Sequence, residues 1–170
     1  NGTLKIVNSS YIPYWHDGNY NYTNNFDFTV YSNTDIIFDN VKFLLDGRAE
    51  NTYYKMHLNT TGSIYFYNST NLTAKDFRDS ELKLIASEIN LNNGTQIFIG
   101  TKYTYDYSDT TIYSDIIFDV NKLIIYNSTV TVDSQQTGTY EQSYNRKGYS
   151  DLVINSNDLE VSCEVVTRIA

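Results

Sequence analysis

One recurring unit limits the fold of this chain most strongly: an apolar strand, a short Asn-Ser corner and a second strand follow one another directly. The unit appears in "KIVNSSYI" (5–12), "IYFYNSTNLTA" (64–74) and "LIIYNSTVTVDS" (123–134), and "LVINSNDLEVS" (152–162) has the same layout. β-Branched and aromatic residues favour strands on both sides of each corner. The chain is therefore expected to consist of strands joined by exposed corners.

The composition agrees with an all-β chain. Tyr is abundant, with 17 residues among 170, and the helix formers Ala, Leu and Glu are scarce. A chain of this length is most simply one domain with a sizeable core. Strand segments recur every 8 to 12 residues or so, as sandwiches and barrels require; they are expected at 3–7, 27–31, 35–38, 41–45, 53–58, 63–67, 82–91, 95–99, 102–106, 110–118, 122–126, 129–133, 151–155 and 158–169.

Two all-β architectures fit these strands. The main expectation is an immunoglobulin- or pilin-like β-sandwich, with an N-terminal strand and linker at 1–13 and a head domain at 14–170. The alternative is a parallel β-helix, in which each coil turns at an Asn. The corners noted above lie 60, 59 and 28 residues apart, and this uneven spacing favours the sandwich over a solenoid.

Three local patterns add detail. "TVYSNTDIIFDNVKFLL" (29–45) and "TIYSDIIFDVNKLII" (111–125) share Asp-Ile-Ile-Phe-Asp, which suggests a weak internal duplication. The Asn93-Gly94 pair is the favoured sequence of a two-residue hairpin turn. The segment 73–76 has the form of a capping box and predicts a short helix through about Ser80.

The two ends of the chain differ. Residues 159–170 alternate, with Leu159, Val161 and Cys163 on one side, so this strand is expected inside a sheet with that side in the core. Cys163 would then be a small core hydrophobe. At the other end, the short apolar strand Leu4–Val7 is followed by the only proline, so it can pair within its own fold or with a neighbour.

Eight Asn-x-Ser/Thr sequons are present, about twice as many as the composition would give by chance. Sequons at strand ends are exposed and open to N-linked glycosylation. The predicted glycan sites are Asn1, Asn8, Asn21, Asn59, Asn68, Asn71, Asn93 and Asn127. The chain begins at Asn1, which we interpret as the loss of a signal peptide, and we expect an extracellular or cell-surface location.

Charge and motif content exclude several classes of function. The net charge of −8 argues against binding to nucleic acid or to an acidic membrane, and no apolar run is long enough to span a membrane. Two histidines, His16 and His57, and one cysteine make a zinc site improbable. Acid pairs such as Asp106/Asp109 read as solvated turn residues. We predict no enzyme activity, no metal and no cofactor.

One segment has the character of a binding site. In "YIPYWHDGNYNY" (11–22), the rings of Tyr14, Trp15, Tyr20 and Tyr22 are candidates for stacking on sugars, although aromatic residues in strands are more often core or cross-strand residues. This segment supports an alternative function for the chain, that of a carbohydrate-binding or adhesin module.

The exported, sequon-rich and Tyr/Asn/Thr-rich character of the chain, with a detachable strand at Leu4–Val7, resembles the subunits of archaeal extracellular filaments known as threads. The resemblance implies a pilin-like head, heavy glycosylation and head-to-tail polymerisation with identical subunits by donor-strand complementation. Leu4, Ile6 and Val7 would be the donor residues. The main functional expectation is therefore a structural filament subunit with a role in cell adhesion.

Overall fold

A computed structural model of the chain describes residues 3–11, 25–47, 53–75, 77–100, 111–133 and 147–168. Within these ranges the regular structure is entirely β-strand, which confirms the all-β prediction. No helix among these residues is long and apolar enough to cross a membrane. The strands are β1 (Leu4–Val7), β2 (Ser10–Tyr11), β3 (Phe26–Ser32), β4 (Ile36–Asp39), β5 (Lys42–Asp46), β6 (Tyr53–Thr60), β7 (Ser63–Tyr67), β8 (Asn71–Lys75), β9 (Asp79–Leu91), β10 (Gln96–Gly100), β11 (Thr111–Asp133) and β12 (Lys147–Arg168).

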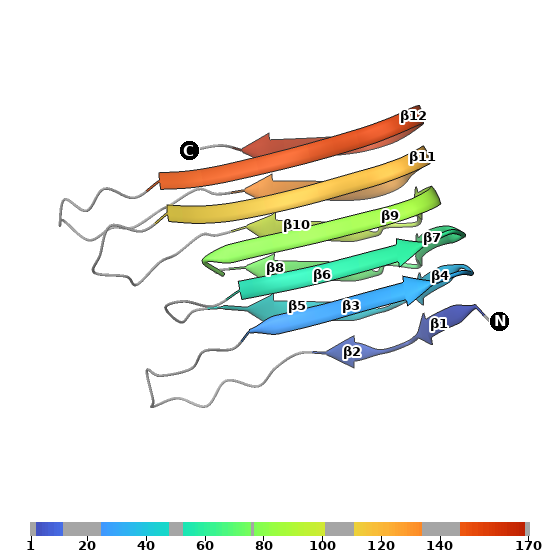
Figure 1. Ribbon diagram of the computed structural model, residues 1–170, viewed down its shortest axis with the longest axis horizontal. Helices are drawn as coiled ribbons and strands as arrows, with labels where there is room; N and C mark the ends of the chain where they lie inside the picture. Colours follow the sequence, from blue (N-terminus) through green and yellow to red (C-terminus); the bar gives the residue numbers. More distant parts are fainter. Residues whose placement is uncertain are drawn as a thin grey trace.

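The described strands wind into a parallel β-solenoid with three faces and six coils. The two chain ends lie at opposite ends of the stack (Figure 1). The first face holds β3, β6 and the initial parts of β9, β11 and β12. The second face holds β1, β4, β7 and later parts of the same three long strands. The third face holds β2, β5, β8, β10 and the last parts of β11 and β12.

The β-sandwich expectation is therefore wrong, and the parallel β-helix alternative is confirmed. Every pairing between the described strands is parallel. Equivalent positions on the second face are 32, 28, 25, 34 and 36 residues apart in sequence; they are Leu4, Ile36, Ile64, Ile89, Leu123 and Leu159.

The uneven spacing arises in one segment of each coil, the connection from the third face back to the first. The arc from the first face to the end of the third holds 19 to 22 residues, as in 26–46 and 150–168. The connection back to the first face holds from 4 residues (76–79) to 16 residues (134–149). The stacked part of each coil is thus nearly constant, while the connections hide its repeat in the sequence.

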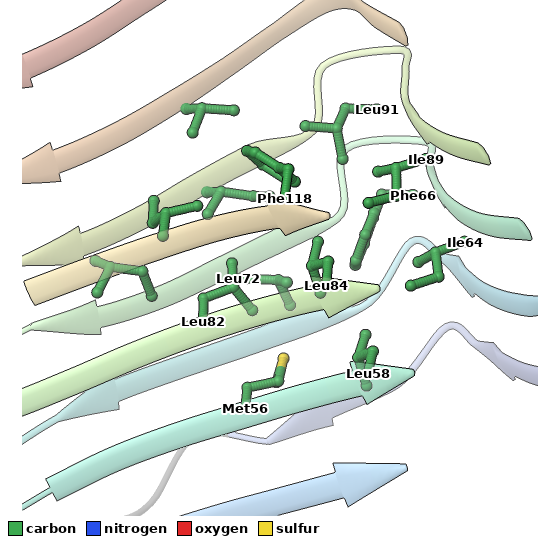
Figure 2. Close-up of a cluster of buried hydrophobic side chains, with 14 of the residues drawn as sticks. Met56, Leu58, Ile64, Phe66, Leu72, Leu82, Leu84, Ile89, Leu91 and Phe118 are labelled. Atoms are coloured by element: carbon green, nitrogen blue, oxygen red, sulfur yellow. The ribbon is translucent and has the colours of Figure 1, made fainter. Parts of the chain in front are cut away.

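The core is a set of columns in which each coil places a similar apolar side chain on the one below. Ile36, Ile64, Ile89 and Leu123 form one column, and all are buried. Figure 2 shows such side chains converging between the faces. The neighbouring column contains the stacked rings of Phe38 and Phe66, whose centroids are 5.1 Å apart. Burial of each such side chain contributes about 1.5–3 kcal/mol, so stacking the coils is the main source of stability.

Three local expectations are also wrong. Residues 71–75 form strand β8 where a helix was expected, because Leu72 and Ala74 point into the core with the alternation of a strand. Asn93-Gly94 forms a corner between parallel strands, and no hairpin. The shared Asp-Ile-Ile-Phe-Asp motif lies on the second face in β4 but on the first face in β11, so it is no structural repeat.

The two ends of the solenoid depart from the expectations in different ways. At the start, β1 pairs with β4 of its own chain, and Leu4 and Ile6 pack against the core while Val7 is exposed. At the other end, β12 is the outermost strand and pairs with β11. The expectation of a fully buried apolar side is wrong here, since Leu159 and Val161 remain 49% and 44% exposed. The side chain of Cys163 lies outside the described part.

Candidate functional site

A ladder of asparagines marks the corner between the second and third faces. Asn8, Asn40, Asn68, Asn93 and Asn127 occupy this corner in five successive coils, and all five have a left-handed backbone with φ between 45° and 53°. Asn tolerates this conformation better than other residues with a Cβ, because its short polar side chain bonds locally. A left-handed Asn thus marks this corner, and Ser follows it at three of the five positions, Asn8, Asn68 and Asn127.

Hydrogen bonds run along the ladder from coil to coil. Asn40 Nδ2 donates to Asn8 Oδ1 at 2.9 Å, and Asn68 Nδ2 donates to Asp39 Oδ1 at 2.7 Å. Further along, Gly94 N donates to the Asn127 carbonyl at 2.7 Å. These bonds run along the stacking direction, from one coil to the next, so they fix the register of each coil on its neighbour.

Hydroxyl groups close the same corner from inside. Buried Thr70 donates from Oγ1 to the Tyr67 carbonyl at 2.7 Å, and buried Thr95 donates to the Asn92 carbonyl at 2.8 Å. In a shorter version of the corner, Ser128 Oγ donates to the Tyr126 carbonyl at 2.9 Å. Carbonyls turned inward at a corner need such partners, since an unpaired buried acceptor is costly. The corner therefore has its own reason to use Asn followed by Ser or Thr.

This structural reason accounts for much of the sequon excess, and glycosylation itself stays a prediction. The amides of Asn8, Asn68, Asn93 and Asn127 are exposed at the corner. Half-buried positions on outer strand surfaces hold Asn59 in β6 and Asn71 in β8, and Asn71 Nδ2 donates to Gln96 Oε1 at 3.2 Å. Asn1 and Asn21 lie outside the described residues.

Beside the ladder, the outer side of the second face carries a patch that we call the tyrosine–asparagine surface. It consists of Tyr65, Tyr67, Asn90, Asn92 and Tyr126. Tyr65 and Tyr67 stack with ring centroids 5.5 Å apart, and Tyr126 is 55% exposed. Tyr67, Asn92 and Tyr126 directly follow Phe66, Leu91 and Ile125, and Leu91 pairs with Phe66 on one side and with Ile125 on the other. This register places the two tyrosines two rungs, or about 9.6 Å, apart.

The electrostatics keep this surface uncharged. Desolvation, followed by the nearby Tyr65, Glu88 and Asp35, raises the pKa of Tyr67, so its hydroxyl stays protonated at neutral pH. The carboxamide oxygens of Asn90 and Asn92 are buried and have no hydrogen-bond partner within the described part of the chain. The surface thus combines aromatic rings and a neutral hydroxyl with two amides whose oxygens are unpaired but covered.

A column of carboxylates lies on the outer side of the first face. Glu81, Asp115 and Asp151 occupy successive rungs, and Asp79 lies beside them. Desolvation raises the pKa of Asp115, and the adjacent charges of Asp151, Glu81 and Asp79 raise it further. Desolvation and the charge of Glu81 likewise raise the pKa of Asp79. His57 hydrogen-bonds Glu81 at one end of this column.

Other candidates from the sequence are only partly placed. No group of three or more His, Cys, Asp or Glu side chains that could hold a metal ion occurs in the ranges that the structure describes. The sugar-stacking candidates Tyr14, Trp15, Tyr20 and Tyr22 lie outside the described residues, as do His16 and the Asp106/Asp109 pair. The tyrosine–asparagine surface was not predicted, because its members become neighbours only through the stacking of the coils.

Comparisons with known proteins give no match, either to a family model, to a curated protein or to a solved structure.

The corner makes a clear prediction for stability. Replacing Asn68 by Ala should lower the free energy of unfolding by about 1–2 kcal/mol, because an Ala Cβ is strained in the left-handed region. Asn68→Gly should cost less, since Gly adopts this conformation freely. Asn59→Ala, in strand β6, is the matched control and should change little. Denaturant unfolding of the three variants measures this, and equal loss for Ala and Gly at position 68 would contradict it.

The carboxylate column predicts a pH dependence. Because the folded-state pKa of Asp115 and Asp79 is raised, their contribution to stability is fully present below the unfolded-state pKa of about 3.9 and is lost as the pH rises through the folded value. Asp115→Asn should therefore raise the melting temperature at pH 7 and change it little at pH 4. Exposed Asp119→Asn is the control. Equal effects at both pH values would contradict the assignment.

Proposed function

We propose that this chain is an extracellular carbohydrate-binding module with an adhesive role, and that it binds neutral polysaccharides on the tyrosine–asparagine surface. The single observation that carries the proposal is the arrangement of Tyr67 and Tyr126 on one flat face, two rungs apart, with Asn92 between them. Aromatic rings stack on the apolar side of sugar rings, and amides and hydroxyls bond to sugar hydroxyls.

The geometry suits an extended sugar chain. A separation of about 9.6 Å between the two tyrosines is comparable to the length of a disaccharide unit. A polysaccharide lying along the solenoid axis would meet the ring of Tyr67, the amide of Asn92 and the ring of Tyr126 in turn, and Asp39 lies on the rung before Tyr67. The oxygens of Asn90 and Asn92 are buried and unpaired, so they would bond to sugar hydroxyls only after their amides turn outward.

Charge supports a neutral ligand over an acidic one. The net charge of the chain is −8, and Lys122, the cation next to this surface on β11, is already paired with Glu160 at 2.7 Å. An anionic polysaccharide would be repelled by the chain as a whole.

A filament subunit is the second candidate function, and the open apolar ends of the solenoid favour it. Polymerisation by strand donation would require Leu4, Ile6 and Val7 to leave β4 of their own chain, where β1 forms the first rung. Stacking of whole coils needs no such exchange, and it leaves β1 in place.

Binding to neutral polysaccharides tests the main proposal. In affinity electrophoresis or on a glycan array, the chain should bind at least one neutral polysaccharide. The double variant Tyr67→Ala/Tyr126→Ala should weaken binding by about tenfold, since each aromatic contact contributes about 0.5–1.5 kcal/mol. Tyr31→Ala is the matched control: its ring is 78% exposed but lies on the first face. Absence of binding, or equal loss in the control, would contradict the proposal.

A further inference from the structure

The last coil of the solenoid has an uncovered surface, and its residue pattern is that of a contact between two coils within the chain. On the second face, Leu159 and Val161 continue the core columns of Leu123 and Ile125. Their counterparts one coil below are buried, whereas Leu159 and Val161 remain about half exposed. Along the same edge, β12 has no described strand on its outer side, so its backbone groups there are free to pair.

The first coil has the matching pattern at the opposite end. Leu4 and Ile6 of β1 begin the same two columns, with Ile36 and Phe38 as their partners. If β1 of a second copy were laid on β12 in parallel register, Leu4 would follow Leu159 and Ile6 would follow Val161. Both columns would then continue across the joint with apolar side chains in contact, as they do between coils within the chain.

In this parallel register, a positive charge of one copy would also meet a negative charge of the other on the outer side of the second face. The row on the second face that begins with Lys5 passes through Ile37, Tyr65, Asn90 and Ile124 and ends with Glu160. In the stacked arrangement, Lys5 of one copy would lie one rung from Glu160 of the other. One rung is about 4.8 Å, which is within reach of an ion pair between these long side chains. Within each copy Lys5 lies 3.6 Å from Asp39 and Glu160 lies 2.7 Å from Lys122, so the new pair would join two existing ion pairs across the joint.

We propose that copies of this chain stack end to end, the second face of the last coil pairing in parallel with β1 of the next copy. The joint uses the second and third faces, because the first coil has no described strand on the first face. It joins different surfaces of the two copies, so it is heterologous and extends into a linear polymer. The proposal does not depend on glycan binding, since the joint and the tyrosine–asparagine surface use different residues.

Sedimentation velocity of the purified 170-residue chain at increasing concentration, with electron microscopy of the same samples, tests the stacking. The wild type should form linear oligomers. Lys5→Glu and Glu160→Lys should each raise the dissociation constant of the joint about tenfold. A chain carrying both reversals should assemble as the wild type does. An equimolar mixture of the two single variants should again form linear oligomers, with the two variants alternating, because both mixed joints have complementary charges and neither self-joint does.

Control variants distinguish assembly through this joint from assembly through other surfaces. Lys42→Glu changes an exposed charge on the third face and should assemble normally, and so should Tyr67→Ala/Tyr126→Ala. Leu159→Asp/Val161→Asp should remain monomeric with an unchanged circular dichroism spectrum. A wild type that is monomeric at every concentration would overturn the proposal and leave the end to another occupant, such as a further coil or a different protein. Oligomers that ignore the charge reversals would overturn it too, by placing the joint elsewhere.

Discussion

The left-handed corner between the second and third faces holds the coils of this protein in register. Five asparagines take up the same strained backbone conformation in successive coils, and side-chain and backbone hydrogen bonds link each to its neighbours. Because side chains alternate between the two sides of a strand, a slip of one residue would move every core residue to the surface. The apolar columns, the outer rows and the ends of the stack all depend on this register.

The alternation of apolar and polar residues along the strands allows the secondary structure to be predicted from the sequence. Most of the expected strands coincide with observed ones. The architecture is harder to predict, because the Asn-Ser unit does not always coincide with the corners. Asn40 and Asn93 lie at corners without a following Ser, while Asn155, which precedes Ser156, lies on the first face opposite Asp119. With variable connections between the coils, the repeat is visible only once the corner is recognised as Asn in a left-handed conformation. Contacts between coils, such as those that bring Tyr67 and Tyr126 together, follow from register alone.

Two kinds of surface result from this construction. The outer faces repeat the same position on every rung, which suits ligands that are themselves repetitive, and the tyrosine–asparagine surface on the second face consists of uncharged rings and amides. The ends are different, because each coil relies on the next one to cover its apolar side chains and pair its backbone. Leu159 and Val161 show what a coil looks like when that cover is absent. The proposed glycan binding and the proposed end-to-end stacking therefore use separate parts of the molecule and are compatible with each other.

Disulfide trapping between adjacent coils tests the parallel in-register solenoid most directly. Tyr31 and Asn59 are register partners on the outer side of β3 and β6. In a Cys163→Ser background, Tyr31→Cys/Asn59→Cys should form an intrachain disulfide rapidly, because parallel partners lie about 4.8 Å apart, within the range that a disulfide spans. Tyr31→Cys/Lys55→Cys, offset by four residues along β6, should not. Preferential bonding of the offset pair, or none in either, would contradict the parallel register on which the account rests.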